Sequence, residues 1–502
     1  MTRSRGSSRA PRHALAIDLG ASSGRVIAAA YEGDRVTLRE IYRFPNAPVR
    51  TMPGSPSDRL YWDVLAIWSH VVRGLGLAVK ELGADTIDSI GVDSWAVDYA
   101  LLGPSGRLIH HPACYRDRRT ERPFRELRER LTDNWLYGAT GIQFQPFNTL
   151  YQLAADAADP DRPLDRAQTM LLIPDLIAYW LTGTRSTERT NASHTQLFDA
   201  ASDTWRLDIA EAAGIPASVL PPIRGPGTPL GTVLRGVAEA TGLNPQTRVI
   251  AVATHDTASA FIGTPIADAR TDAIISSGTW SLVGVEIEEP IRTEDARLAN
   301  CSNEAGPRGT TRFLKNVVGM WLIQQCQHAW ALDGRAYDAA EITRLATTAP
   351  SRTSLIDVDD PAFTAPGDMP RRIHDWFTMR GESPPETEAD LARCIFESVA
   401  AKTVATLGQI ERLTGTAIER IHIVGGGANN ALLNQLIADA SDRPVMAGPA
   451  EATAMGNALM QLVGMGHLED IAQARQLARR STAFTEFEPA ASHTRNDPVT
   501  AP

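Results

Sequence analysis

Two pairs of short apolar segments, each joined by a turn of small residues, constrain the fold of this chain most strongly. Residues 14–19 and 26–31 flank the turn at 20–25, and residues 273–276 and 281–286 flank a second Gly- and Ser-containing turn. Apolar runs on both sides of such a turn predict antiparallel strand pairs. Because one pair opens each half of the chain, we infer a duplicated fold with a boundary near residues 255–270.

Strand and helix patterns alternate in both halves. Residues 63–82 form an amphipathic pattern that begins at a helix-capping Asp63, and residues 87–92 form a buried-strand pattern. Around the second strand pair, the predicted elements are a strand at 248–253, helices at 258–262 and 388–414, a strand at 421–424 and a helix from about 430. This succession of strands and helices is typical of α/β proteins.

Composition and charge limit the classes of partner. The 502 residues suffice for two or three domains, and the formal net charge of −10 gives no general attraction to nucleic acid or to an anionic membrane. No apolar run reaches the roughly 18 residues of a membrane helix. The four cysteines show no paired spacing, which is typical of a reducing cytoplasm. We expect a cytoplasmic protein without a membrane or nucleic-acid partner, and the choice between monomer and dimer stays open.

The two ends of the chain are polar and lack a periodic pattern. Residues 1–13 are rich in Ser and Arg without a signal-type apolar stretch, and residues 486–502 are rich in Pro and Ala. We expect a disordered leader at 1–13 and a disordered tail at 486–502.

Asp18 and the turn that follows it form the first candidate site. Small residues let backbone N–H groups approach a phosphate, and a carboxylate on the preceding strand can hold Mg²⁺. A tight hairpin turn would need the same glycines, so the spacing alone leaves both interpretations open. The second turn, which contains Thr279, has the same two interpretations. Two such turns in one protein favour the binding of a triphosphate.

Asp256 forms the second candidate site. It follows a predicted strand and precedes a predicted helix, so its carboxylate could face a cleft and accept a proton from a substrate hydroxyl. Asp is also a favoured helix N-cap, and the two roles are compatible. His255 beside it is more typical of a hydrogen-bonding neighbour than of a titrating catalyst.

Two further segments carry weaker signals. The three glycines at 425–427 lie between a strand and a helix, where a ligand could lie against the backbone, although a plain turn explains them as well. Asp93, Trp95 and Asp98 alternate carboxylates with an aromatic ring, a combination that sugar pockets use. A tryptophan in the domain core is the competing interpretation.

Taken together, these segments resemble the FGGY family of carbohydrate kinases. The resemblance runs in order from about residue 14 to residue 468, and its most diagnostic stretch is GIQFQPFNTLYQL at 141–153. The other segments that carry it are 17–25, 91–98, 115–117, 255–260, 276–282, 314–324 and 423–430. Each segment is weak alone, and their joint order is specific.

The resemblance implies an α/β protein with two actin-like, ribonuclease-H-like domains and an active site in the cleft between them. It assigns sugar binding to residues 14–257 and nucleotide binding to residues 258–485. Asp256 occupies the position of the catalytic base, and Asp18 that of the residue that helps to place Mg²⁺. The positions that match ATP-binding residues are Ala21, Ser22, Ser23, Gly24, Arg25, Thr279, Gln324 and Gly426. The positions that match sugar-binding residues are Ala96, His255, Asp256, Thr257 and Asn316.

One of these positions departs from the family's pattern. Ala96 lies where some members have a glycine whose backbone contacts the sugar. A backbone contact can survive this change, but the added methyl group narrows the pocket and puts the identity of the sugar in doubt.

The resemblance implies transfer of a phosphoryl group from ATP, with Mg²⁺, to the C1 hydroxyl of a ketose. Other ketoses or polyols, such as fuculose and xylulose, are the nearest alternatives for the acceptor. A sugar sensor that has lost catalysis and a bare ATPase of the actin-like group are alternatives of other classes. The presence of Asp256 and of the aromatic, carboxylate-containing segment 93–98 favours a kinase over the ATPase.

Overall fold

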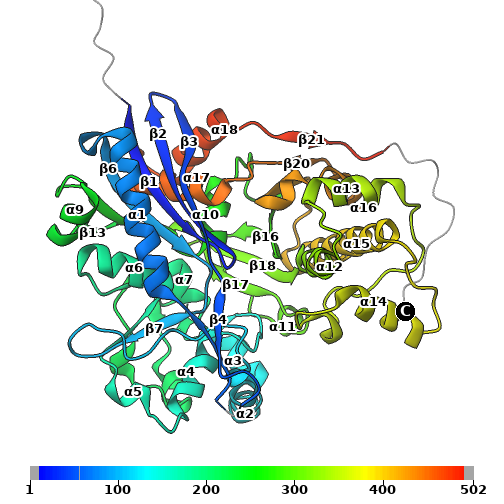
Figure 1. Cartoon of the computed structure of the whole chain (residues 1–502), viewed down its shortest axis with the longest axis horizontal. Coiled ribbons are helices and arrows are strands. Elements are labelled where there is room, and N and C mark those ends of the chain that lie inside the picture. Colours follow the sequence, from blue (N-terminus) through cyan, green and yellow to red (C-terminus); the bar gives the residue numbers. More distant parts are fainter. Residues whose placement is uncertain (1–10, 56, 200, 491–502) are drawn as a thin grey trace, which may run out of the picture. The chain divides into compact units, whose positions relative to one another are not determined.

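The structure, a computed structural model, describes residues 11–55, 57–199 and 201–490. The chain forms two compact units (Figure 1). Unit 1 comprises Met1–Pro265, Glu286–Phe313 and Ala452–Thr482, and unit 2 comprises Ile266–Val285, Leu314–Glu451 and Ala483–Pro502. A late segment of the chain therefore returns to the unit that the first half builds. None of the described helices is both long enough and apolar enough to cross a membrane.

Unit 1 contains a six-stranded sheet in the order β13-β14-β6-β1-β2-β3. Its strands are β1 (Arg12–Leu19), β2 (Ser23–Glu32), β3 (Arg35–Pro45), β6 (Ile87–Ser94), β13 (Thr228–Thr232) and β14 (Arg248–Ala251). Strands β1, β2 and β3 pair antiparallel, and β6 pairs parallel to both β1 and β14. This arrangement confirms the predicted strand pair at the start of the chain.

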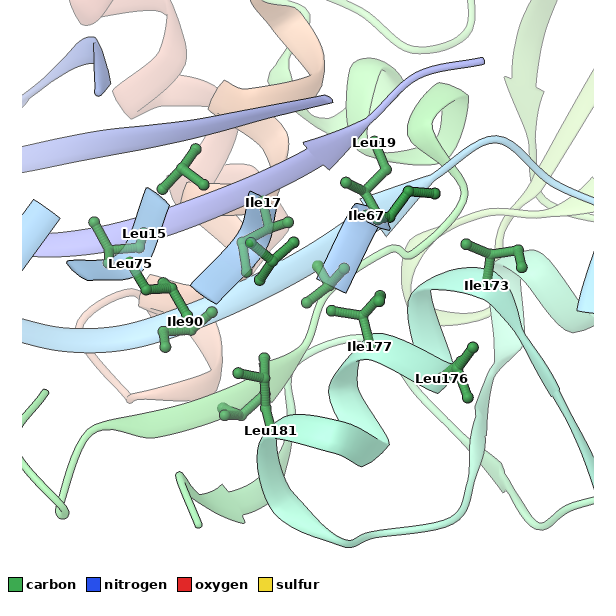
Figure 2. Close-up of a cluster of buried hydrophobic side chains, with 14 of the residues drawn as sticks. Leu15, Ile17, Leu19, Ile67, Leu75, Ile90, Ile173, Leu176, Ile177 and Leu181 are labelled. Carbon is green, nitrogen blue, oxygen red and sulfur yellow. The ribbon is translucent and has the colours of Figure 1, made fainter. Parts of the chain in front are cut away.

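The two faces of this sheet differ because side chains alternate along each strand. Leu15, Ile17 and Leu19 of β1 pack with helix α1 (Val64–Leu82) and helix α6 (Ile173–Thr182) in one apolar core (Figure 2). The intervening Ala14 and Ala16 pack with helix α17 (Ala452–Gly464). Small residues on this second face let α17 lie close to the sheet.

The helix α10 (Asp256–Gly263) packs against α17. The crossing is so tight that a Cβ atom on Gly456 of α17 would overlap the carbonyl oxygen of Ser259 in α10. The other helices of unit 1 are α2 (Glu121–Leu131), α3 (Asp133–Thr140), α4 (Thr149–Ala157), α5 (Pro163–Arg166), α7 (Arg189–Ser193), α8 (Leu207–Ala212), α9 (Arg235–Thr241), α11 (Glu294–Leu298) and α18 (Ile471–Ser481). Its short paired strands are β4 (Pro48–Thr51), β5 (Arg59–Trp62), β7 (Tyr99–Leu102), β8 (Thr169–Leu172), β9 (Thr187–Glu188), β10 (Phe198–Asp199), β11 (Thr204–Trp205) and β12 (Ile223–Arg224).

A seven-stranded sheet, β17-β18-β16-β15-β19-β20-β21, repeats the order of the first. Its strands are β15 (Asp272–Ser277), β16 (Trp280–Ile287), β17 (Ser302–Ala305), β18 (Thr311–Val318), β19 (Arg420–Val424), β20 (Val445–Ala447) and β21 (Thr485–Phe487). As in unit 1, an antiparallel hairpin, β15 and β16, is followed by two parallel neighbours and an antiparallel edge strand. The inferred duplication is therefore confirmed at the level of topology.

The helices of unit 2 are α12 (Trp321–Leu332), α13 (Ala339–Thr348), α14 (Met369–Met379), α15 (Glu388–Thr414) and α16 (Ala431–Ser441). The long helix predicted at 388–414 is confirmed residue for residue by α15. Its ends are set locally, because Thr387 and Asp390 form a capping box and Gly415 ends the helix in the left-handed conformation.

Two boundaries at the ends of the chain need correction. Strand β1 begins at Arg12, so the predicted leader extends two residues too far, and residues 1–10 lie outside the described residues. Strand β21 includes Glu486 and Phe487, which the prediction placed in the tail. Backbone pairing with β2 and with β20 orders these residues despite their unremarkable composition. The remainder of the predicted tail from residue 491 onward lies outside the described residues.

Candidate active site

The turn after β1 is built by backbone hydrogen bonds. The N–H of Gly20 donates to the carbonyl of Ser23 over 2.9 Å, and the N–H of Asn46 donates to the carbonyl of Ser22 over 3.0 Å. Gly24 faces the ring of Phe44 so closely that a Cβ atom would overlap it. The predicted phosphate-binding residues 21–25 therefore lie in this compact turn and in the first residues of β2, and Ser22 in the turn is exposed to solvent.

Strand register places two acidic residues side by side at the end of the sheet. Asp18 on β1 is the partner of Asp93 on the parallel strand β6, and of Arg25 on the antiparallel strand β2. The Arg25 guanidinium forms an ion pair with the Asp18 carboxylate, which is mostly buried. Both Asp18 and Asp93 continue the sheet face that carries Ala16 and Gly91, since they lie two residues further along their strands.

Asp93 is held by a helix from the far end of the sequence. Asn457 of α17 donates a hydrogen bond from Nδ2 to Asp93 Oδ2, and both side chains are fully buried. Asp93 Oδ1 is buried and has no hydrogen-bond partner among the described residues. Burial raises the pKa of Asp93 well above its usual range, and the negative charges of Asp18 and Asp256 raise it further.

Asp256 is the first residue of α10, with His255 in the cap position. The interpretation of Asp256 as the N-cap is therefore wrong by one residue, but its Oδ1 still accepts the N–H of Thr257 over 2.6 Å. The Asp256 side chain remains 32% exposed. Desolvation by the surrounding protein raises its pKa to about 7, and the charge of Asp18 contributes to the shift. A half-ionised carboxylate at neutral pH suits a general base.

The predicted sugar-binding residues of unit 1 follow neighbouring strand ends. The N–H of Ser94, at the end of β6, donates to the carbonyl of Thr254 over 2.9 Å, and Ser94 forms a bridge with His255. Ala96 therefore lies two residues beyond the strand end that contacts His255. His255, Thr257 and Ala96 are all buried.

Asp98 has a structural role, and its interpretation as a sugar ligand is wrong. Its carboxylate is fully buried and accepts hydrogen bonds from Trp62 Nε1 over 2.6 Å and from Trp95 Nε1 over 3.0 Å. Gln152 and the backbone N–H of Tyr115 donate to it as well. With its lone pairs occupied, Asp98 holds the segment that contains Ala96, and Trp95 belongs to the core.

A buried polar group that the sequence did not reveal lies next to His255. His194, His255 and Glu304 offer donor atoms within 4.8 Å of one another, and Arg312 lies 3.0 Å from Glu304. These residues come from four separate segments and share no spacing that could mark them. Arg312 is not marked either, because its strand β18 also contains the charged Lys315 and the polar Thr311 and Asn316.

Unit 2 brings two of the predicted nucleotide-binding residues into contact. Thr279, in the turn between β15 and β16, donates from Oγ1 to Gln324 Oε1 over 3.2 Å. Gln324 lies in α12 and is exposed. Asn316, a predicted sugar-binding residue, is half-buried on β18.

The three consecutive glycines of unit 2 have different surroundings. Gly425 has a φ of +79°, which favours glycine, and a Cβ atom on Gly427 would overlap the Ser277 hydroxyl. At Gly426 nothing would lie within 4 Å of an added Cβ atom, and this residue is exposed. The loop thus packs through Gly427 against β15 and leaves Gly426 accessible.

Two hollows of the described chain differ in their relation to these residues. A cavity of about 230 Å³ in unit 2 is lined by Ala428 and Asn429, directly after the three glycines, together with residues 447–450 and 483–485. A larger surface hollow of about 810 Å³ lies over α2, α4 and α8 and contains none of the predicted site residues.

The acidic group of unit 1 has the chemistry of a divalent-cation site. Asp18 and Asp93 are neighbours in register, and the unpartnered Asp93 Oδ1 is a free hard-oxygen ligand. Burial is the main cause of the raised pKa values of Asp93 and Asp256, and a bound cation would relieve the repulsion from neighbouring carboxylates that adds to them. The residues present therefore fit Mg²⁺, which commonly keeps several of its waters and takes few carboxylates.

The sequence matches one family over both units. Residues 13–263 match the N-terminal domain of the FGGY family of carbohydrate kinases, and residues 273–465 match its C-terminal domain.

Curated relatives are similar over nearly their whole length. The rhamnulokinase of Bacteroides thetaiotaomicron is 39% identical over 475 residues, 95% of each chain. That of Klebsiella pneumoniae is 41% identical over 483 residues, again 95% of each chain. That of Enterococcus faecalis is 40% identical over 473 residues, 93% of this chain and 92% of the relative.

Solved structures with the same fold are more distant in sequence. A xylulose kinase from Lactobacillus acidophilus superposes with a TM-score of 0.79 at 16% identity, covering 95% of this chain and 94% of that one. A glycerol kinase from Plasmodium falciparum, solved with ADP, superposes with a TM-score of 0.72 at 17% identity and the same coverage. At such identities the likeness shows the fold alone.

Proposed function

This chain belongs to the FGGY family of carbohydrate kinases, and we propose that it transfers the γ-phosphoryl group of ATP to the C1 hydroxyl of L-rhamnulose. The products are L-rhamnulose 1-phosphate and ADP. The observation that carries the choice of sugar is the identity of about 40% with curated rhamnulokinases over some 95% of the chain. The match extends through both units, so it includes the sugar-binding and the nucleotide-binding positions alike.

Asp256 acts as the general base in this proposal. Its carboxylate takes the proton of the C1 hydroxyl while the sugar oxygen forms a bond to the γ-phosphorus. The bond between that phosphorus and the bridging oxygen breaks, and ADP leaves with the electron pair. Three observations support this role: the position of Asp256 at the start of α10, its partial exposure, and a pKa raised to about 7.

Most of the sugar-binding positions follow the strand ends of unit 1. His255 and Thr257 flank the base, and Ala96 offers its backbone from a segment that Asp98 keeps rigid. Asn316 supplies an amide that can donate and accept. A polar group matched to one hydroxyl configuration rejects an epimer, because the wrong epimer leaves a buried donor or acceptor unpaired at a cost of about 1–3 kcal/mol.

The phosphates are bound by the two small-residue turns. Residues 21–25 supply backbone N–H groups, the hydroxyls of Ser22 and Ser23, and the guanidinium of Arg25. Thr279 and Gln324 act together, as their hydrogen bond suggests, and the accessible Gly426 lets the nucleoside lie against the backbone. Positioning and charge stabilisation of this kind supply most of the catalysis in phosphoryl transfer.

Mg²⁺ would be held by Asp18 with Asp93 beside it, and when bound it neutralises negative charge on the transferring phosphoryl group. Arg25 forms an ion pair with Asp18, which fixes that carboxylate in place.

The proposal also includes the roles of the two halves of the chain and the location of the protein in the cell. Residues 14–257 carry most of the sugar-binding positions, and residues 258–485 carry the remaining nucleotide-binding positions. The four cysteines are buried and form no disulfide, which suits a protein of the reducing cytoplasm.

A coupled assay of ADP formation tests the function. We expect turnover with L-rhamnulose and a higher kcat/KM for it than for L-fuculose or L-xylulose, with Asp256→Asn as the inactive control. Equal or faster turnover of another ketose would show that L-rhamnulose is not the preferred substrate, while the assignment as a sugar kinase would stand. ATP consumption that no ketose stimulates would reject the kinase itself.

A further inference from the structure

Arg312 lies at the centre of the buried polar group beside the proposed base. The side chains of Arg312 and Glu304 are fully buried, and those of His194 and His255 are 7% and 5% exposed. All four belong to unit 1, and none of them binds a substrate in the proposed mechanism except His255. A buried charge is costly unless it is paired, so this arrangement calls for a physical reason.

Each nitrogen of the Arg312 guanidinium has a different partner. Nε donates to the carbonyl of Ala305 over 3.1 Å, one terminal nitrogen lies 3.0 Å from Glu304 Oε2, and the other lies 3.4 Å from His255 Nδ1. A planar guanidinium with three separate partners cannot rotate without losing one of them. Glu304 and the backbone therefore set the direction from which Arg312 approaches His255.

The position of Arg312 determines which ring nitrogen of His255, Nδ1 or Nε2, carries the hydrogen. A guanidinium nitrogen can donate but never accept, so Nδ1 is the acceptor in this contact. Glu304 Oε2 lies 3.5 Å from the same Nδ1 but accepts no hydrogen bond from the described residues. Burial lowers the pKa of His255 to about 4, which keeps the ring neutral with a single N–H group. The hydrogen is then on Nε2, which lies 3.4 Å from Asp256 Oδ1.

The two carboxylate oxygens of Asp256 differ in their hydrogen-bond partners. Oδ1 accepts the N–H of Thr257 over 2.6 Å and the Thr257 hydroxyl over 3.2 Å, and it faces His255 Nε2. Oδ2 accepts no hydrogen bond from the described part of the chain. One oxygen is thus anchored, and the other is left for the proton of the sugar hydroxyl.

A bound metal is the competing explanation for the same residues, since two histidines and a glutamate form a familiar zinc donor set. Arg312 argues against it. The guanidinium already places a positive charge 3.0 Å from Glu304, and a cation held by Glu304 and His255 would lie against that charge.

We propose that Arg312 is a positioning residue for phosphoryl transfer: held by Glu304, it fixes the His255 tautomer with hydrogen on Nε2, and that hydrogen orients the Asp256 carboxylate. The proposal rests on the proposed function for the role of Asp256. The tautomer itself can be measured independently of any activity.

Nitrogen NMR of protein labelled with ¹⁵N-histidine tests the tautomer in the unmodified chain. The His255→Gln variant identifies the resonances of His255 by their disappearance. We expect Nε2 to be the protonated nitrogen and Nδ1 the unprotonated one at neutral pH. A hydrogen on Nδ1 would overturn the proposal, whatever the enzyme's substrate is.

Kinetics of Arg312→Lys test the consequence. Lysine keeps the charge beside Glu304 but cannot reach three partners with one nitrogen, so we expect kcat to fall by about 10- to 100-fold with little change in KM for ATP. Arg189→Lys is the matched control, since Arg189 is also a buried arginine, bonded to Asp203 and to the carbonyl of Gly306, and lies in the same unit.

The outcomes separate the two claims. Loss of kcat in Arg312→Lys with a changed His255 spectrum supports the positioning role, and an unchanged kcat refutes it. If Arg312→Lys fails to fold, the double variant Arg312→Met with Glu304→Met removes both charges together and is measured in its place. If the unmodified chain phosphorylates no ketose, the proposed function fails, while the NMR result still decides the tautomer.

Discussion

Asn457 donates a hydrogen bond to Asp93 although 364 residues separate them in the chain. Gln461, one turn further along α17, donates to Asn457 Oδ1 over 2.7 Å and to the carbonyl of Leu15 over 3.0 Å. Ser89 donates to Gln461 in turn, and all these side chains are buried. Helix α17, near the end of the sequence, therefore holds Asp93 in place at the end of the sheet that the first strands form.

Exchanging Asp93 and Asn457 tests whether Asp93 is needed for its hydrogen bond or for the position of its charge. In Asn457→Asp alone, two buried carboxyl groups face each other, and we expect a loss of about 1–3 kcal/mol in the free energy of unfolding. The double variant Asp93→Asn with Asn457→Asp restores one carboxylate–amide pair, so stability should largely return. Its kcat/KM should stay low, because the charge has moved away from Asp18. Urea unfolding and steady-state kinetics measure the two effects, and full recovery of activity in the double variant would show that Asp93 serves structure only.

Removing the basicity of Asp256 should abolish turnover without unfolding the protein. Asp256→Asn keeps an oxygen that can accept the N–H of Thr257, so the first turn of α10 stays satisfied. We expect kcat to fall by about 10²- to 10⁴-fold, the usual contribution of a general base. An unchanged melting temperature is the control. Near-normal turnover in this variant would assign the proton transfer to another group.

The pH dependence of the reaction should follow the ionisation of Asp256. A base must be deprotonated to act, and burial together with Asp18 raises the pKa of Asp256 to about 7. We therefore expect kcat/KM to be level above that pH and to fall about tenfold per unit below it. His255 cannot cause this decline, because its pKa is lowered to about 4. A profile that stays flat down to about pH 5 would contradict the assigned base.

Replacing Gly427 by alanine should affect stability, whereas replacing Gly426 by alanine should affect ATP binding. Gly427→Ala places a methyl group into the Ser277 side chain, and we expect a loss of about 1–3 kcal/mol in the free energy of unfolding. Gly426→Ala meets no atom within 4 Å, so stability should be unaffected while KM for ATP rises. Calorimetry and nucleotide titration distinguish the two variants. Unchanged ATP affinity in Gly426→Ala would remove this glycine from the nucleotide site.

The sequence by itself determined the features that depend on neighbouring residues. Apolar runs on both sides of small-residue turns predicted the hairpin that opens each half of the chain. The helix predicted at 388–414 matches α15, because helix ends are set by residues close to them in the sequence. The order of family-like segments pointed to the kinase family, and the match over both units confirms it.

Only the tertiary structure determined the features that depend on burial and on contacts between residues far apart in the sequence. Asp98 looked like a sugar ligand, yet four donors from separate segments enclose it in the core. The contacts of Arg312 with His255 and of Asn457 with Asp93 join residues with no common spacing, and the raised pKa of Asp256 depends on the protein packed around it. Desolvation and Coulomb interaction depend on distance in space, which a linear pattern does not contain.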